Sequence, residues 1–188
     1  MPSLRFRLAT AADTDAIARL HADSWRRHYR GAYSDAFLDG DVVVDRIETW
    51  RARLREHDPC RCTILAERAG VIGFANTYLE HDETWGALLD NLHVGAAHQR
   101  EGVGAMLIAR TADAVVERSR RGWTGLYLWV LEQNCAARAF YEALGASPAG
   151  RERATPPGGA PGRLNGAPFK LRYSWADAAA LSARGRAS

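Results

Sequence analysis

Hydrophobic and polar positions alternate along this chain with two periods, one typical of strands and one typical of helices. At residues 4–8, Leu, Phe and Leu alternate with two arginines, which is the pattern of a half-buried strand. A helical spacing follows, in which Ile17, Leu20 and Ser24 share one face, and a second helix is expected over about residues 41–57. The amino-terminal part therefore predicts one strand followed by two helices.

Strands dominate the next part of the chain. Residues 62–67 and 71–78 have strand character and flank Ala69-Gly70, so they predict a hairpin. The polar residues 80–84 predict a loop, and residues 88–94 predict the next strand.

Helices and strands alternate in the carboxyl-terminal half. The pattern predicts a helix over 103–118, a short strand over 126–130, a helix over 134–144, a Pro- and Gly-rich loop over 155–168 and a final strand over 169–175. Helices interleaved with strands predict a mixed α+β fold, with a mixed sheet covered on both faces. We expect one domain over residues 1–188, with a core over about 4–175 and a carboxyl-terminal tail over 176–188.

Composition limits the class of protein. A chain of 188 residues that is 47% hydrophobic can build one full core, but not two comfortable domains. It has no apolar run near the ~20 residues that span a bilayer, and its first residues have no signal-peptide core. A cytoplasmic protein without a membrane partner is therefore expected.

Charge and cysteine content narrow the partners further. The net charge is +3, and the arginines are scattered rather than arranged in a basic stripe, so no nucleic-acid partner is expected and an anionic small ligand is favoured. Cys60 and Cys62 are too close for a common zinc pair, and Cys135 supplies no second pair. No metal site is predicted, and the thiols are expected to be reduced.

The strongest local feature is the segment from Gln99 to Gly104, which lies between a predicted strand and a predicted helix. Gly102 and Gly104 leave main-chain N–H groups open at the positive end of the helix dipole, where a diphosphate can approach closely. The segment lacks the Gly-Lys-Ser/Thr of a Walker loop, and Leu107 stands where a dinucleotide fingerprint needs a third glycine. A bare Gly-x-Gly also starts helices that bind no ligand, so context must decide.

That context is a second segment, in which Asn134 precedes a predicted helix carrying Phe140, Tyr141 and Gly145. Together, Gln99-Arg-Glu-Gly-Val-Gly104 and Asn134 with Phe-Tyr-Glu-Ala-Leu-Gly145 resemble the two motifs of the Gcn5-related N-acetyltransferase superfamily. The similarity is specific over about residues 88–146 and rests on element order before residue 79. It implies a mostly antiparallel sheet of six to seven strands flanked by about four helices.

The resemblance implies that acetyl-CoA is the co-substrate and that an amine attacks its thioester directly, without a covalent enzyme intermediate. The expected CoA contacts come from the end of the strand, the glycine loop and the following helix: His93, Val94, Gln99, Arg100, Glu101, Gly102, Val103, Gly104, Asn134 and Arg138. Gly95 is a further candidate for the main-chain contacts, and a main-chain N–H there would polarise the acetyl carbonyl.

Two catalytic roles are assigned by the resemblance. Tyr141 stands where the family commonly has the tyrosine that protonates the leaving thiolate, although it could also be a core tyrosine. Many relatives have a glutamate at the position of Leu88, so the resemblance does not supply the base, and Asp90 on the same strand face is the first candidate. His93, Glu80 and a chain of water molecules are the alternatives.

The acceptor is an amine of a small molecule or a peptide, and nothing in the motifs identifies it. The dense aromatic group of Trp25, Tyr29 and Tyr33 suits either an acceptor pocket or a small core. Dimers are common in the family, so a homodimer is one alternative to a monomer. A longer acyl donor, such as succinyl-CoA, is an alternative to acetyl-CoA. The alternatives to an enzyme are a non-catalytic acyl-CoA-binding or sensor module and a structural or regulatory domain in which the glycines only start a helix.

Overall fold

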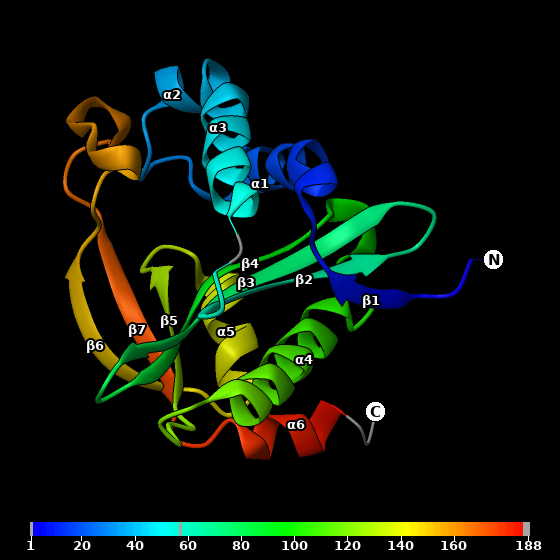
Figure 1. The fold of residues 1–188 in the computed structure, drawn as a ribbon. Helices are drawn as coiled ribbons and strands as arrows, with labels where there is room; N and C mark the ends of the chain where they lie inside the picture. Colours follow the sequence, from blue (N-terminus) through cyan, green and yellow to red (C-terminus); the bar gives the residue numbers. More distant parts are fainter. Residues whose placement is uncertain (1, 57, 186–188) are drawn as a thin grey trace.

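A computed structural model describes residues 2–56 and 58–185 of the chain. Seven strands and six α-helices follow one another within these residues (Figure 1). In chain order they are β1 (Arg5–Leu8), α1 (Thr14–His28), α2 (Asp35–Asp39), α3 (Val42–Arg55), β2 (Arg61–Glu67), β3 (Val71–Asp82), β4 (Gly86–Val94), α4 (Val103–Arg118), β5 (Leu126–Leu131), α5 (Cys135–Ala143), β6 (Ser147–Arg153), β7 (Phe169–Trp175) and α6 (Ala179–Gly185).

The strands form a single sheet in the order β1-β2-β3-β4-β5-β7-β6. Every neighbouring pair is antiparallel except β4 and β5, which are parallel. The parallel pair is joined only at its start, through Ala87 with Leu126, Leu88 with Tyr127 and Leu89 with Leu128. Beyond Leu89 the two strands have no pairing with each other, so the sheet opens between them.

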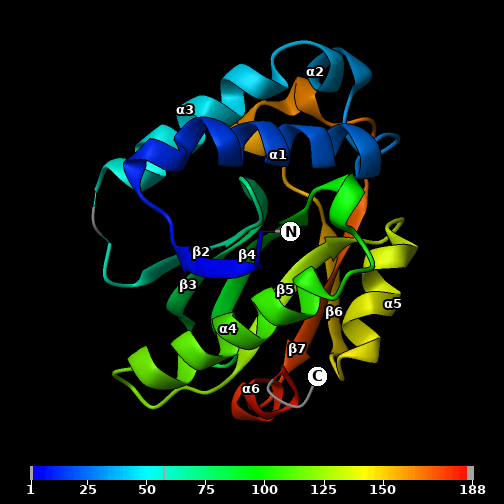
Figure 2. The ribbon, with the colours of Figure 1, turned by 90° about the vertical axis from the view of Figure 1, so that its right-hand side faces the viewer.

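Helices cover both faces of the sheet (Figures 1 and 2). α1, α2 and α3 lie on one side, and α4, α5 and α6 lie on the other. The larger core joins α4 and α6 to the sheet and includes Leu107, Leu128 and Tyr173, whereas a smaller core around Ile17, Trp50 and Phe74 lies under α1 and α3. The predicted fold class, a mixed and mostly antiparallel sheet between helices, is confirmed.

Several element boundaries differ from those predicted. The polar residues 80–84 are not all loop, because β3 continues to Asp82, which pairs with Gly86 across a tight turn. α2 and β6 were not predicted separately. β6 is largely exposed and lacks the alternation of apolar residues that identifies a half-buried strand.

The described residues also differ from the expected tail over residues 176–188, of which 186–188 lie outside the described part of the chain. Residues 179–185 form α6, which packs on α4, and Ala178 and Leu181 are buried in the larger core. The segment is short and rich in alanine, so its sequence carries few apolar positions from which a helical face can be recognised. No helix in residues 2–56 and 58–185 is long and apolar enough to cross a membrane.

Candidate functional site

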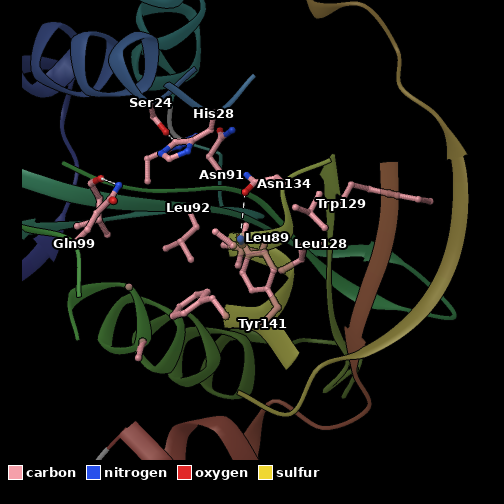
Figure 3. A pocket seen from close by; sticks show the side chains of 18 of the residues that line it. Ser24, His28, Leu89, Asn91, Leu92, Gln99, Leu128, Trp129, Asn134 and Tyr141 are labelled. Carbon is pink, nitrogen blue, oxygen red and sulfur yellow. Dashed lines mark hydrogen bonds between the residues drawn. The ribbon is translucent and has the colours of Figure 1, made fainter. Parts of the chain in front are cut away.

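The opening between β4 and β5 leads into a cavity of about 450 Å³. Its walls come from the end of β4, the loop before α4, the start of α4, the middle of β5, the start of α5 and the last turns of α1 (Figure 3). The two motifs recognised in the sequence therefore meet at one place, because the parallel strands that precede them are neighbours in the sheet.

The glycine loop has a conformation that exposes its main-chain N–H groups. Arg100 and Gly102 both have positive φ angles, 66° and 79°, and Gly102 is the amino-terminal cap of α4. The first turn of a helix leaves its N–H groups without helical acceptors, here those of residues 102–105. A Cβ atom on Gly104 would lie 3.2 Å from the Phe140 ring, so this glycine also lets α5 approach α4.

The predicted loop residues do not all face the cavity. Gln99, Arg100, Gly102 and Gly104 line it. Glu101 instead forms an ion pair of 2.6 Å with Arg68 outside the cavity.

Val103 also lies outside the cavity, because its side chain is buried in the larger core. A role for Glu101 and Val103 in cofactor binding is therefore restricted to their main chain.

The free edge of β4 supplies a second set of main-chain groups. Gly95 N–H donates to the Ile72 carbonyl of β3 at 2.8 Å. Because successive residues of a strand direct their N–H groups to opposite sides, His93 N–H also points toward β3, while those of Leu92 and Val94 point toward the opening. The Val94 carbonyl accepts a hydrogen bond from Gln99 Nε2 at 3.3 Å, consistent with this direction. Val94 and Leu92, rather than His93 and Gly95, have main-chain groups available to a ligand.

Asp90 is the extra residue of a β-bulge. The register of β3 with β4 passes from Asn76 opposite Asn91 to Thr77 opposite Leu89, which leaves Asp90 without a partner on β3. Its carboxylate lines the cavity and accepts hydrogen bonds from Arg53 at 2.9 Å and from Asn76 at 3.4 Å. Asp90 is thus fixed at the point where the two strands separate.

The other carboxylate considered as a base, Glu80, lies away from this cavity. Its Oε1 atom accepts hydrogen bonds from the N–H groups of Arg120 and Arg121, in the connection between α4 and β5. This contact holds the connection against β3 and leaves Asp90 as the carboxylate of the described residues that lines the cavity.

α5 brings Asn134 and Tyr141 to the cavity (Figure 3). Asn134 caps the helix, since its Oδ1 atom accepts the N–H of Ala137 at 3.2 Å. Tyr141 is 9% exposed, and burial, followed by the nearby Tyr29, raises the pKa of its phenol well above the usual value. Its hydroxyl forms no hydrogen bond with any residue of 2–56 or 58–185, so it remains a proton donor without a protein partner.

Arg138, expected to contact CoA, lies outside the cavity lining. Its guanidinium donates to the Tyr173 hydroxyl at 3.3 Å and to the Glu132 carbonyl at 3.1 Å. These contacts join α5 to β7 and to the end of β5, which indicates a structural role in this conformation.

His93 lies in a buried group of imidazole and aromatic rings. Its Nδ1 atom is 2.8 Å from the Ser24 hydroxyl of α1, and its ring centre is 4.5 Å from that of His21. Burial lowers the pKa of His93 to about 3 and that of His21 well below its usual value. Burial therefore favours the neutral form of both rings at physiological pH and opposes proton uptake by His93.

The buried histidine pair predicts a loss of stability in mild acid. The unfolded chain binds protons near pH 6.5 and the folded chain does not, so the free energy of unfolding is undiminished above pH 6.5 and falls as the pH drops toward 3. About 2 kcal/mol should be lost per imidazole between neutral pH and pH 5. Urea unfolding at the two pH values measures this, and His93→Gln should remove about half of the pH-dependent part. An equal pH dependence in wild type and variant would contradict it.

The α1 side of the cavity carries further polar groups that the sequence did not single out. Ser24 and Asn91 line it, and Arg53 joins Asn91 to Asp90 by donating to both side chains at 2.9 Å. A small hydroxyl on an otherwise buried helix face was the only sequence signal for Ser24. The sequence contained no signal for Arg53, because its contact with Asp90 depends on how α3 packs across β4.

The turn after α1 closes this side. Tyr29 lines the cavity, and burial, with a smaller effect of the Asp90 charge, raises its pKa to about 12. The Arg30 carbonyl accepts a hydrogen bond of 2.7 Å from Gln133, beside Asn134. The loop between β6 and β7 attaches to the same turn, where Asn165 N–H donates to the Ala32 carbonyl at 2.8 Å. Three distant segments therefore meet next to the cavity-lining residues Tyr29 and Asn134.

Comparisons with known proteins agree with this architecture. The family model of the acetyltransferase (GNAT) family matches residues 16–146. The chain belongs to this family of N-acetyltransferases. It is 27% identical to an uncharacterized N-acetyltransferase of Bacillus subtilis (strain 168), YuaI, over 141 residues that cover 73% of this chain and 76% of the relative. It is 37% identical to the [ribosomal protein bS18]-alanine N-acetyltransferase of Escherichia coli (strain K12) over 81 residues, which are 43% of this chain and 51% of the relative.

Solved structures share the fold at low sequence identity. The PaiA N-acetyltransferase from Thermoplasma acidophilum in complex with coenzyme A has a TM-score of 0.69 and 17% identity, with coverage of 92% of this chain and 99% of that one. The acetyltransferase YncA from Salmonella typhimurium with acetyl-CoA has a TM-score of 0.60 and 19% identity, with coverage of 93% and 94%.

Proposed function

We propose that this protein transfers an acetyl group from acetyl-CoA to an amine by direct attack on the thioester. The observation that carries the proposal is the opening between β4 and β5, which has unpaired main-chain groups on β4, exposed N–H groups at the start of α4 and a phenol without a partner on α5. CoA complexes of relatives with the same fold support acetyl-CoA as the donor.

The residues around the cavity fit this co-substrate. The N–H groups of residues 102–105 suit a diphosphate, because they point out of a helix amino terminus that has no side chain in front of it. The positively charged Arg100 lies at the same mouth. Leu92 and Val94 present strand-edge groups that suit the amide-containing arm of CoA, and one of their N–H groups would stabilise negative charge on the thioester oxygen.

Proton transfer then falls to two residues on opposite walls. Asp90 accepts a proton from the incoming ammonium, which frees the nitrogen lone pair for attack on the carbonyl carbon. As the new C–N bond forms and the C–S bond breaks, Tyr141 gives its proton to the leaving sulfur. The proton released by the attacking nitrogen reprotonates the tyrosinate, and Asp90 releases its proton to solvent, so the protein is unchanged after one turnover.

Calorimetric titration of the protein with acetyl-CoA and with CoA tests the proposal. Micromolar binding of both, followed by release of thiol in the presence of amines, is the expected result. N-terminal alanine peptides are rational first acceptors because a relative acetylates alanine of a ribosomal protein. Absence of CoA binding would exclude the enzyme, whereas binding without thiol release for any amine would favour a non-catalytic acyl-CoA-binding module.

Asp90→Asn tests the proposed base. The variant should lower kcat/KM by roughly 10- to 100-fold and flatten the acid limb of the pH–rate profile, because the group that accepts the proton is lost. Glu83→Gln is a matched control, since the Glu83 side chain is 85% exposed in the turn before β4. An unaltered profile for Asp90→Asn would exclude Asp90 and leave water as the proton acceptor.

A further inference from the structure

Arg172 of β7 lies between two tryptophan side chains at one end of the sheet opening. Its guanidinium carbon is 4.6 Å from the ring centres of both Trp85 and Trp129, and 5.8 Å from that of Tyr127. Stacking on aromatic faces holds an arginine in one orientation while its N–H groups stay available at the edge of the guanidinium plane. All three of Arg172, Trp85 and Trp129 remain partly exposed.

The charge of Arg172 is not matched by the protein. Its Nε atom is buried without a hydrogen-bond partner, and the guanidinium forms no ion pair with any described residue. Lys170 lies two residues away on the same strand face and differs in this respect. Its ammonium contacts Trp129 and also forms an ion pair with Glu152 at 3.0 Å. Asp82 interacts with Arg172 only at longer range and uses its Oδ1 atom to accept the N–H groups of Thr84 and Trp85. The guanidinium of Arg172 is therefore a positive charge held in place by aromatic rings, without an ion-pair partner among the described residues.

The position of Arg172 relates it to the acceptor side of the cavity. Arg172 pairs with Trp129 on β5, and Trp129 follows Leu128, the last residue that pairs with β4. Asp90 follows Leu89, the partner of Leu128, so Asp90 lies across the sheet opening from Trp129 and Arg172. Figure 3 shows that the Trp129 side chain extends away from the cavity and across β7. Because β4 and β5 separate beyond Leu89, two strand spacings, roughly 10 Å, is the least distance between Asp90 and Arg172.

We propose that Arg172 binds a carboxylate of the acceptor, and that the acceptor is a linear amine, such as a peptide amino terminus, with its acidic group at least roughly 10 Å from the reacting nitrogen. This inference rests on the proposed function, since Asp90 marks the position of the amine. An extended peptide advances about 3.3 Å per residue, so the side chain of its third residue reaches the required distance. The excess of positive charge on the chain, +3, favours the approach of such an acceptor.

Paired peptide amides with a free amino terminus test the inference: Ala-Ser-Glu-Ala and Ala-Ser-Gln-Ala, which differ only in one charge. Wild-type protein should acetylate the glutamate peptide with a kcat/KM roughly 10-fold higher. Arg172→Gln should bring the ratio of the two peptides close to one, Arg172→Lys should retain part of it, and Lys170→Gln should leave it as in wild type because Lys170 already has a partner.

The ratio separates recognition from damage to the fold, because a destabilised variant loses activity on both peptides equally. A wild-type ratio near one, or a ratio that Arg172→Gln does not change, would overturn the inference. Failure of the proposed function itself looks different: CoA then does not bind, or no amine in a wider panel releases thiol.

Discussion

Gly102→Glu should abolish measurable CoA binding and leave the fold intact. A carboxylate at this position stands in front of the first N–H groups of α4, where the diphosphate is expected. At ~4 Å and an effective dielectric constant of ~20, two like charges repel by about 4 kcal/mol, which corresponds to far more than a 100-fold loss of affinity. Titration calorimetry with CoA measures the loss.

The same substitution also strains the main chain, so a control is needed. Gly102 has a φ of 79°, where a side chain costs about 1–2 kcal/mol, although only the tip of Met106 lies within 4 Å of the point that a Cβ atom would occupy. Gly102→Asn introduces comparable bulk without charge and tolerates this φ. It should bind CoA within about 10-fold of wild type, while both variants unfold at similar temperatures. Wild-type affinity in Gly102→Glu would contradict the assignment of the loop.

The sequence predicted those parts of the site whose structure is determined by residues close together in the chain. Val103–Arg118 and Phe169–Trp175 have the predicted bounds, because helical and strand periodicities there are long and uninterrupted. The glycines before α4 and the capping Asn134 act through main-chain geometry within a few residues. Short segments of sequence therefore contain the information that fixes them.

The bulge at Asp90 could not be predicted from the alternation of residues. Strict alternation from Leu88 places Asp90 on one face of β4 and both Asn91 and His93 on the other. In the structure, Arg53 contacts Asp90 and Asn91 together, and His93 lies on the same side against Ser24 of α1. One extra residue reverses the faces beyond it, and the choice to bulge depends on pairing with β3, which lies outside the segment.

The acceptor side was equally beyond local sequence reasoning. The proposed acceptor side includes the turn after α1, the residues before α5 and the loop between β6 and β7, which lie far apart in the chain and contact one another only in the folded protein. The predicted loop over 155–168 had no recognisable partner in the sequence. Its attachment combines a main-chain hydrogen bond to Ala32 with hydrogen bonds from the side chains of Asn165 and Ser34 to main-chain carbonyls, and none of these acceptors can be recognised in the sequence.

Tyr141→Phe should lower kcat by roughly 100-fold or more, the usual contribution of a general acid, while CoA affinity stays within a few-fold of wild type. The hydroxyl has no hydrogen-bond partner among the described residues, so its removal leaves no buried donor or acceptor unsatisfied. The ring keeps its contacts with Phe140 and Trp175, whose centres are 5.3 Å and 6.2 Å away. The unfolding temperature should therefore be unchanged.

The raised pKa of Tyr141 is compatible with this role. A phenol that ionises only at high pH is fully protonated at neutral pH, so the acid is present in every molecule at the start of turnover. It is a weak acid toward a solvated thiolate, but desolvation in the same cavity raises the basicity of the leaving sulfur as well. In the proposed mechanism, the proton would therefore move as the C–S bond breaks and not before.

A matched variant separates loss of the acid from loss of packing. Tyr29→Phe removes another phenol hydroxyl from the α1 side of the same cavity and should reduce kcat far less than Tyr141→Phe. The loss of rate in Tyr141→Phe should be largest with a poor leaving group. A thioester whose thiol is acidic needs no proton donor, so it should restore the rate of Tyr141→Phe toward that of wild type. Equal rates for wild type and Tyr141→Phe with acetyl-CoA would show that Tyr141 only packs.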